Sequence, residues 1–311
     1  MGCERTPLGI ALALALLLGL AHGDVVQFIF GDSLSDVGNN NYLTKSLARA
    51  ALPWYGIDFG SGMPNGRFCN GRTVADIIGD KMGLPRPPAF LDPSVDETVI
   101  AKSGLNYASG GGGILNETSS LFIQRFSLYK QIELFQGTQA FMREKIGQAA
   151  ADKLFGEAYY VVAMGANDFI NNYLLPVYSD SWTYNGDTFV KYMESTNKLA
   201  LSFNKQAGAV IKQLAASLPN ATFQFGDVYD YFQDIIDRPY MHGFNNSHAP
   251  CCTLGKVRPT LTCTPLSTLC KDRSKYVFWD EYHPTDRANE LIALETLKRL
   301  NITVVANTTS S

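Results

Sequence analysis

The sequence predicts an α/β protein, a three-layer α/β/α sandwich with a central, mainly parallel β-sheet. Short runs of β-branched and aromatic residues alternate along the chain with segments whose apolar residues recur at helical spacing. Each of these runs leads into Gly, Asp or Asn, which is typical of strands in a parallel sheet covered by helices on both faces. The 311 residues contain no internal repeat and no low-complexity linker, so we expect a single domain.

Four runs are predicted to be strands, fewer than the five or six of an average sheet. They are residues 25–30, 104–109, 158–164 and 222–225. In sheets of this kind, ligands bind beyond the carboxyl ends of the strands. Ser33, four consecutive glycines (110–113) and Asn167 each follow one of these strands. We therefore expect one cleft to bring these residues together.

Five segments are predicted to be helices from the spacing of their apolar residues. They are residues 73–82, 121–142, 149–155, 197–218 and 284–300. Thr73 suits a helix cap, and Pro284 suits the first helical position, where its missing N–H has no partner to lose. Residues 53–72 are rich in loop-forming residues, and their two Asn-Gly dipeptides favour tight turns.

Residues 1–23 are predicted to be a secretory signal peptide, which leaves 24–311 as the mature domain. An apolar run from Ile10 to Ala21 ends in the small-x-small cleavage pattern Ala21-His22-Gly23. A membrane anchor is the alternative, but the run is short and no stop-transfer charges follow it. No later apolar stretch is long enough for a transmembrane segment, and a formal net charge of −3 offers no basic field for nucleic acid. We expect a secreted protein.

Cysteines and glycosylation motifs agree with secretion. Four of the five cysteines beyond residue 23 lie within residues 251–270, which predicts a disulfide-stapled loop. A zinc site is the weaker interpretation, because no C-x-x-C pair occurs, and we expect no metal. Five is an odd number, so at least one thiol lacks a partner within the chain. Five Asn-x-Ser/Thr motifs predict exposed N-glycosylation sites; they begin at Asn116, Asn220, Asn245, Asn301 and Asn307.

Ser33 is either an ordinary turn or helix-cap serine or a nucleophile presented at the end of a strand. A nucleophilic serine needs a neutral imidazole, a group that holds the imidazole in the right tautomer, and donors for the oxyanion. His283 has Asp280 three residues ahead of it, within reach of Nδ1. His242 and His248 lie beside the cysteine cluster, a context that favours a solvated loop.

Four blocks of sequence then occur in a family-specific order. They are Gly31-Asp32-Ser33-Leu34, the glycine block 106–113, Gly165-Ala166-Asn167-Asp168 and Asp280-Glu281-Tyr282-His283. With them the chain resembles the GDSL esterase/lipase family of the SGNH hydrolase superfamily. The stretches SDVGNNNYL and NGRFCNGRTVADIIGDKMGL are similar to its secreted plant branch. The resemblance covers nearly all of the mature chain and implies the flavodoxin-like SGNH fold.

The resemblance implies a serine carboxylic-ester hydrolase that works through an acyl-enzyme and uses no cofactor. Ser33 would be the nucleophile, His283 the general base and then acid, and Asp280 its partner. The substrate would be a small-molecule, lipid or cell-wall ester, and the protein would act in the extracellular space or the cell wall. An acyltransferase using the same triad is an alternative.

The oxyanion hole implied by the resemblance combines the Ser33 backbone N–H, the Gly111 N–H and the Asn167 side-chain amide. Gly110 or Gly112 could take the place of Gly111. Glycine suits this position because it lets the backbone approach a reacting carbonyl closely, and an amide donor carries no charge to titrate. A phosphate cradle is disfavoured because no Gly-Lys-Ser/Thr follows the glycines, and the G-x-S-x-G elbow of α/β-hydrolases is absent around Ser33.

One expected segment is missing from the sequence. In the plant branch, a helix, a strand and a Gly-Pro-x-Gly-Cys turn lie between the Gly-x-Asn-Asp block and the long helix that follows. Here residues 188–195 pass directly into 196–200, without such a turn. We therefore expect an internal deletion near residues 194–197, which can leave the sheet without one strand. A non-catalytic or inactive form of the same fold is a second alternative.

Overall fold

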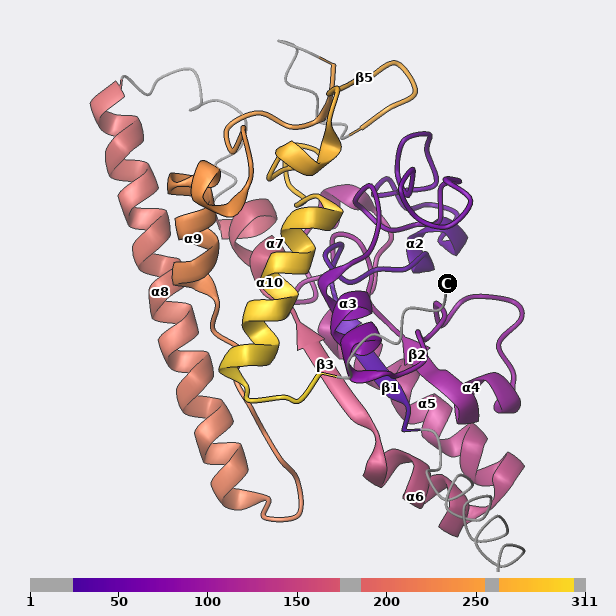
Figure 1. Ribbon diagram of the computed structural model, residues 1–311. Helices are drawn as coiled ribbons and strands as arrows, with labels where there is room; N and C mark the ends of the chain where they lie inside the picture. Colours follow the sequence, from indigo (N-terminus) through magenta and orange to yellow (C-terminus); the bar gives the residue numbers. More distant parts are fainter. Residues whose placement is uncertain (1–24, 174–185, 255–262, 305–311) are drawn as a thin grey trace, which may run out of the picture.

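The computed structural model describes residues 25–173, 186–254 and 263–304, with side chains described for all of these except 172–197. The predicted signal peptide and the motif at Asn307 lie outside the described residues. Figure 1 shows a central sheet with helices on both sides and a long helix set apart from it. The predicted α/β class is confirmed.

The central sheet has three parallel strands in the order β2-β1-β3. They are β1 (Gln27–Gly31), β2 (Gly104–Asn106) and β3 (Tyr159–Ala163). Gln27 is in register with both Gly104 and Tyr159, so all three strands begin at one edge. Their carboxyl ends therefore lie together at the opposite edge, where Ser33, the glycines and Asn167 were expected to meet.

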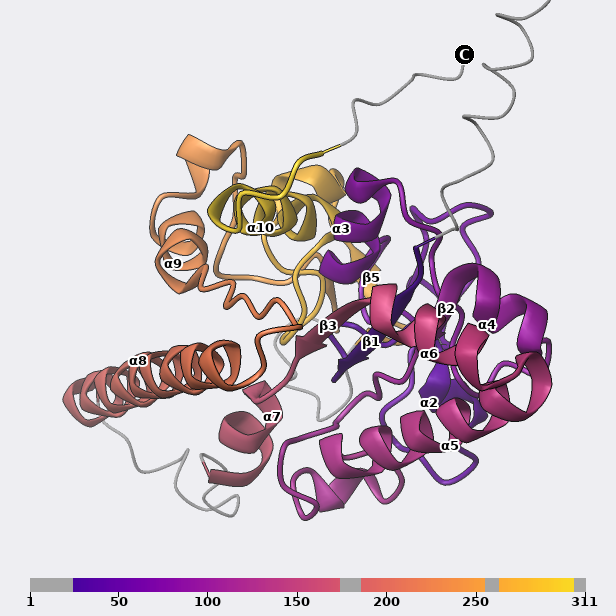
Figure 2. The ribbon, with the colours of Figure 1, turned by 90° about the horizontal axis from the view of Figure 1, so that it is seen from below.

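Helices α5 (Leu128–Ile146) and α6 (Gln148–Glu157) cover one face of this sheet (Figure 2). Every residue of β1 is buried, and Phe28 and Phe30 point into a core with Met142 and Phe155. The predicted helix at 121–142 begins later than expected, because the Ser127 hydroxyl accepts the Lys130 N–H and caps α5 there.

Helices α3 (Val74–Met82) and α10 (Asp286–Arg299) cover the other face (Figure 2). Thr73 begins α3 as predicted, in a capping box with Asp76. The start of α10 differs from the prediction. Thr285 is its N-cap and accepts the Ala288 N–H, so Pro284 precedes the helix instead of opening it.

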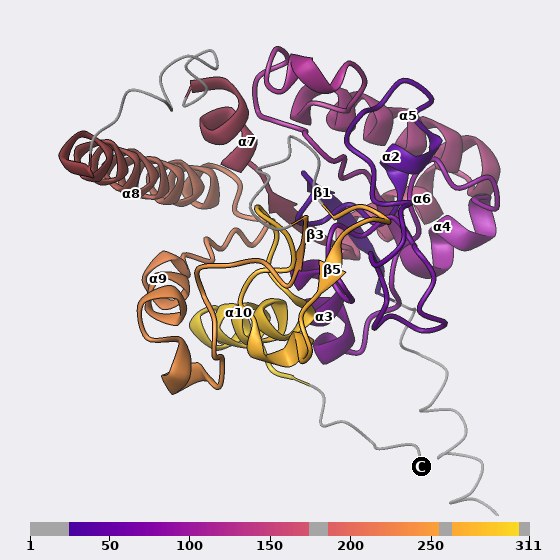
Figure 3. The ribbon, with the colours of Figure 1, turned by 90° about the horizontal axis from the view of Figure 1, so that it is seen from above.

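The remaining elements are short and connect these layers. The helices are α2 (Asn39–Tyr42), α4 (Glu97–Ser103), α7 (Ala166–Asp168) and α9 (Tyr229–Asp237), with 3₁₀ turns at Ser120–Phe122, Pro239–His242 and Arg273–Lys275 and a π turn at Phe169–Tyr173. Strands β4 (Cys252–Thr253) and β5 (Thr268–Leu269) form a separate antiparallel pair. Figures 1 and 3 show that the loops around β5 lie on the side where the central strands end.

The fourth predicted strand, residues 222–225, is not a strand. This stretch pairs with no strand among the described residues, and β3 is the outer strand of the sheet on that side. Tyr159, Tyr160 and Val162 of β3 are 45–62% exposed. A cavity of about 600 Å³ is lined by both Tyr159 and Gln224. A run with strand-like composition needs a neighbouring strand to form a ladder, and here that neighbour is missing.

Helix α8 (Gly186–Ser217) runs without a break through residues 194–197. It lies on the β3 side of the molecule, away from the layer formed by α5 and α6 (Figures 1 and 2). Phe203 of α8 lies against Gly165 at the end of β3, and Gly208 lies against Phe225. The helix therefore bridges β3 and the unpaired stretch 222–225.

Candidate active site

Ser33 lies directly beyond β1, in a tight turn. Backbone N–H groups of Ser35 and Asp36 both donate to the carbonyl of Asp32, at 3.1 and 3.0 Å. Gly31 makes this turn possible, because a Cβ there would come within 2.8 Å of the Ala163 carbonyl oxygen of β3. The turn leaves the Ser33 side chain half-buried, facing a cavity.

The structure brings together the three residues of the predicted triad. His283 Nε2 lies 2.8 Å from Ser33 Oγ, and His283 Nδ1 lies 2.8 and 2.9 Å from the two Asp280 carboxylate oxygens. Asp280 is fully buried, and His283 is 7% exposed. Ser33 is separated from His283 by 250 positions in the chain, so the contact is made only by the tertiary fold.

A tight loop places Asp280 beneath His283. The Trp279 N–H donates to the His283 carbonyl at 2.7 Å, and Phe278 forms an isolated bridge with Pro284. Asp280 Oδ1 then accepts the backbone N–H groups of Tyr282 and His283, both at 2.9 Å. The spacing of Asp280 and His283 predicted their contact, and this loop provides it.

Gly111 lies at the cavity with its backbone N–H directed to no acceptor among the described residues. The two alternatives are already engaged: the Gly110 N–H donates to Asp36 at 2.9 Å, and the Gly112 N–H donates to the Ser109 carbonyl at 2.8 Å. Gly111 has a φ of +79°, which favours glycine, and a Cβ there would lie 2.7 Å from the Phe122 ring.

Asn167 also lines the cavity, and it lies in α7, just beyond β3. Its Nδ2 donates one hydrogen to the Gly112 carbonyl at 2.9 Å, and its Oδ1 accepts from Asn171 Nδ2 at 2.6 Å. These two bonds fix the amide so that its second N–H is left for the cavity.

Two carboxylates, the buried Asp36 and the half-buried Asp168, hold the glycine loop in place, and sequence reasoning missed both. Asp36 accepts the N–H groups of Gly38, Asn39 and Gly110. Asp168 accepts from Ile114 N, Leu115 N and Thr118 Oγ1, at 2.7–3.0 Å. Each acid lies inside a motif block already noted, one three residues after Ser33 and one next to Asn167. Their positions next to these residues could have indicated a role at the site.

Burial raises the pKa of Asp32 to about 6, although the Leu34 N–H and the nearby His283 imidazole act in the opposite direction. Burial likewise raises the pKa of Asp36 to about 6, opposed by its three backbone donors. Two carboxyl groups with raised pKa values thus flank the Ser33 turn. Such groups cluster at functional sites.

The cavity in front of Ser33 has a volume of about 120 Å³. Its walls are mainly apolar, with Leu47, Phe122 and Ile170 among the lining residues, and Ser33, Gly111 and Asn167 also line it. A small apolar group attached to a polar, reacting centre would fit these walls.

His242 and His248 do not line this cavity. His242 Nε2 contacts Asp234 at 2.7 Å in a 3₁₀ turn, not in the solvated loop expected for it, and His248 is exposed. Within the described ranges, no group of three or more His, Cys, Asp or Glu side chains could hold a metal ion.

The predicted disulfide-stapled loop is confirmed. Cys251 pairs with Cys270, and Cys252 pairs with Cys263. The unpaired cysteine is Cys69, which is buried; burial raises the pKa of its thiol to about 12. The cysteine loop is tied to the triad loop, since the Cys252 N–H donates to the Trp279 carbonyl at 2.8 Å.

Four of the predicted glycosylation asparagines lie in the described part of the chain, and each is exposed; they are Asn116, Asn220, Asn245 and Asn301. No helix in the described ranges combines the length and the apolar composition that crossing a bilayer requires.

Known proteins resemble this chain over most of its length. Residues 28–296 match the profile of the GDSL-like lipase/acylhydrolase family. The GDSL esterase/lipase At1g74460 of Arabidopsis thaliana is 57% identical, over 89% of this chain and 87% of its own length. The GDSL esterase/lipase At5g37690 of the same plant is 37% identical, over 91% and 93%.

The alignments also show that the relatives carry residues that this chain lacks. The alignment with At1g74460 has 320 positions, more than the 311 residues of the chain, yet includes only 89% of them, or about 277. About 43 aligned positions, the difference between 320 and 277, therefore have no counterpart here. The chain belongs to the GDSL-like lipase/acylhydrolase family.

Proposed function

We propose that the protein is a secreted serine carboxylic-ester hydrolase with Ser33, His283 and Asp280 as its catalytic triad. Family membership makes it an ester-bond hydrolase of the GDSL type. The observation that carries the triad is the unbroken chain of hydrogen bonds from Ser33 Oγ through the imidazole to Asp280, each 2.8–2.9 Å long. Secretion is supported by the apolar N-terminal run, the two disulfides and the exposed Asn-x-Ser/Thr motifs.

Acylation begins when the Ser33 hydroxyl gives its proton to His283 Nε2 and attacks the ester carbonyl carbon. The carbonyl electrons move onto oxygen, and this oxyanion accepts hydrogen bonds from Ser33 N, Gly111 N and Asn167 Nδ2. Asp280 stabilises the imidazolium without taking its proton. The tetrahedral intermediate then collapses, and His283 gives its proton to the departing alcohol oxygen.

Deacylation repeats these steps with water as the nucleophile. Water gives a proton to His283 Nε2 as its oxygen attacks the acyl carbon, and the same donors hold the second oxyanion. The Ser33 oxygen leaves with the proton from His283, which releases the carboxylic acid. The apolar walls and the volume of about 120 Å³ support a short, apolar acyl group as the one bound during these steps.

Replacing Ser33 by alanine tests this assignment. We expect Ser33→Ala to lower p-nitrophenyl butyrate hydrolysis at least about a thousandfold and to abolish labelling by a fluorophosphonate, because the nucleophile is gone. Ser35→Ala is the matched control, a buried serine two residues away that does not line the cavity. Equal turnover by Ser33→Ala and wild type, with both folded, would contradict the proposal.

A non-catalytic form of the same fold is a second candidate, favoured by the open edge of β3. The exposed β3, the unpaired stretch 222–225 and the roughly 43 missing positions all point to a sheet without its next strand. Because Asn167 follows β3 directly, loss of that neighbour weakens the support of one oxyanion donor. Protein that shows cooperative unfolding but no fluorophosphonate labelling would favour this candidate.

A further inference from the structure

Tyr55 lies far from Ser33 in the chain, in the loop-rich stretch before α3, yet its hydroxyl reaches the triad. The Tyr55 hydroxyl donates to Asp280 Oδ2 at 2.8 Å, and both residues are fully buried. We propose that Tyr55 is a positioning residue for catalysis, which acts by holding and partly neutralising the Asp280 carboxylate. The proposal rests on the proposed function, since it assigns Asp280 to the triad.

The hydrogen bonds of Asp280 show why Tyr55 matters. Oδ1 accepts from the backbone of Tyr282 and His283 and from the imidazole, and all of these donors belong to the same short loop. Tyr55 is the one donor to Asp280 in the described hydrogen bonds that comes from a different part of the chain. Without it, Oδ2 would keep only the imidazole contact, and the carboxylate could turn with its own loop.

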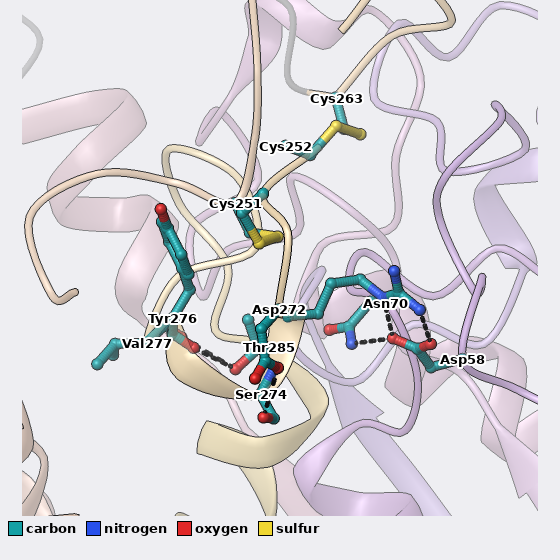
Figure 4. Close-up of a disulfide and its surroundings, with 12 residues drawn as sticks. Asp58, Asn70, Cys251, Cys252, Cys263, Asp272, Ser274, Tyr276, Val277 and Thr285 are labelled. Carbon is teal, nitrogen blue, oxygen red and sulfur yellow. Dashed lines mark hydrogen bonds and ion pairs between the residues drawn. A yellow bond between two sulfur atoms is a disulfide. The ribbon is translucent and has the colours of Figure 1, made fainter. Parts of the chain in front are cut away.

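The loop that carries Tyr55 is itself clamped. Arg273 makes two hydrogen bonds to Asp58, at 2.6 and 2.7 Å, and Asn70 makes a third at 2.7 Å. Figure 4 shows Asp58 facing Asn70 beside the disulfide-bearing segment. The Gly56 N–H also donates to the Cys69 carbonyl at 2.9 Å. The backbone and side-chain bonds of these two residues therefore fix the loop directly after the tyrosine.

The Tyr55 ring connects to the triad a second time, through an aromatic contact. It packs edge-on against Phe68, with centroids 6.0 Å apart, and Phe68 packs against the His283 imidazole at 5.3 Å. Tyr55 itself does not line the cavity. A residue in this position changes how the imidazole works without touching the substrate.

Removal of the hydroxyl has two chemical consequences for Asp280. The carboxylate loses a restraint on its orientation, and it keeps more negative charge facing the imidazole. An imidazolium beside a less compensated carboxylate holds its proton more tightly. The neutral imidazole that activates Ser33 would then predominate only at higher pH.

The test compares Tyr55→Phe with Tyr107→Phe. Tyr107 is also fully buried, and its hydroxyl donates at 2.8 Å, but to Thr138 in the core. We expect Tyr55→Phe to lower kcat about tenfold, to leave KM unchanged and to move the acid limb of the kcat/KM profile about half a pH unit higher. Tyr107→Phe should lose stability without either kinetic change.

A double-mutant cycle separates positioning from packing. If Tyr55 acts through Asp280, Tyr55→Phe should have no further effect on kcat in an Asp280→Asn background. An equal effect in both backgrounds, or wild-type kcat and pH profile in Tyr55→Phe, would overturn the proposal.

One readout does not depend on turnover. The low-field proton NMR signal of His283 Nδ1–H should shift in Tyr55→Phe but not in Tyr107→Phe, and an unchanged signal in Tyr55→Phe would also overturn the proposal. If wild-type protein neither hydrolyses esters nor reacts with a fluorophosphonate, the proposed function fails. The NMR comparison still decides the role of Tyr55 in that case.

Discussion

At the scale of single residues, the site depends on carboxyl groups that several backbone and side-chain donors hold in place. Asp280, Asp36 and Asp168 each accept at least three hydrogen bonds, and each fixes a segment that reaches Ser33. Asp32 is different, because its backbone donors among the described residues all lie within its own turn and it is fully buried. Its carboxylate is therefore poorly compensated, which makes it a source of pH dependence.

Asp32 should make the fold less stable as the pH rises from about 4 to 6. Its pKa is 3.8 in an unfolded chain and about 6 in the fold. Below pH 3.8 both states bind the proton and there is no penalty, whereas above pH 6 the folded state holds a buried, ionised carboxylate. The loss amounts to about 3 kcal/mol across this range.

Asp32→Asn removes this titration while keeping an oxygen that can accept the Leu34 N–H. We expect the free energy of unfolding of Asp32→Asn, relative to wild type, to rise between pH 4 and pH 7. Urea denaturation of both proteins at several pH values measures this difference. The contributions of the other acids to the pH dependence are the same in both proteins and therefore cancel. A difference that stays constant with pH would show that Asp32 does not titrate in this way.

At the scale of elements, β3 is the unusual part of the sheet. The outer edge of β2 is covered, since Phe90 N donates to the Asn106 carbonyl and Asn106 N donates to Pro88. The outer edge of β3 has no such cover among the described residues. Free strand edges present unpaired N–H and C=O groups, which favour association with other chains.

Amide exchange in β3 should alternate along the strand. The Tyr159 N–H donates to the carbonyl of Val26, the residue directly before β1. In a parallel strand alternate residues face the same neighbour, so the Val161 N–H also faces β1, while those of Tyr160 and Val162 face the open edge. We expect fast hydrogen exchange at 160 and 162 and slow exchange at 159 and 161.

Residue-resolved hydrogen–deuterium exchange by NMR measures this pattern. The two slow positions provide an internal control within the same strand. Equal protection at all four amides would mean that another segment, or another copy of the chain, covers the edge in solution.

At the scale of the whole molecule, a closely hydrogen-bonded candidate site lies beside a sheet whose β3 edge is open in the described residues. The site is built from the ends of three strands and from the loop 277–285, all of which are described and tightly bonded. Beyond β3 lie a cavity of about 600 Å³, an unpaired stretch and α8. A folded domain is stable by only about 5–15 kcal/mol, so a missing strand can remove a large part of that stability.

Restoring the missing residues should stabilise the protein. We expect a chimera that carries the extra segment of At1g74460 between residues 194 and 197 to unfold at a higher temperature than the present chain. The inserted strand would pair with β3 and with residues 222–225, and it would bury Tyr160 and Val162. Differential scanning calorimetry measures the change.

An insertion of equal length made of Gly and Ser is the matched control, because it adds chain without strand-forming residues. If the chimera melts no higher than this control, the open edge of β3 is not the site of the missing segment.

Much of the site could be predicted because its chemistry is local to short motifs. The strand ends at Gly31 and Gly165 and the spacing of Asp280 and His283 are readable from neighbouring residues, and the structure brings them together. Tyr55 could not be found in this way. Its partner is 225 positions away, and nothing in its own surroundings in the chain indicates a role.

Local patterns in the sequence were enough to predict the class of fold, the strands β1, β2 and β3, the disulfide-stapled loop and the residues that gather around Ser33. These features depend on local composition, on periodicity and on short motifs, all of which can be read from neighbouring residues. The folded structure was needed to show that 222–225 is not a strand and that Tyr55 reaches Asp280. It was also needed to show that the Gly111 N–H, unlike those of Gly110 and Gly112, has no acceptor among the described residues. Each of these depends on a partner distant in the chain, because hydrogen bonds between strands and between loops are made only when the chain folds.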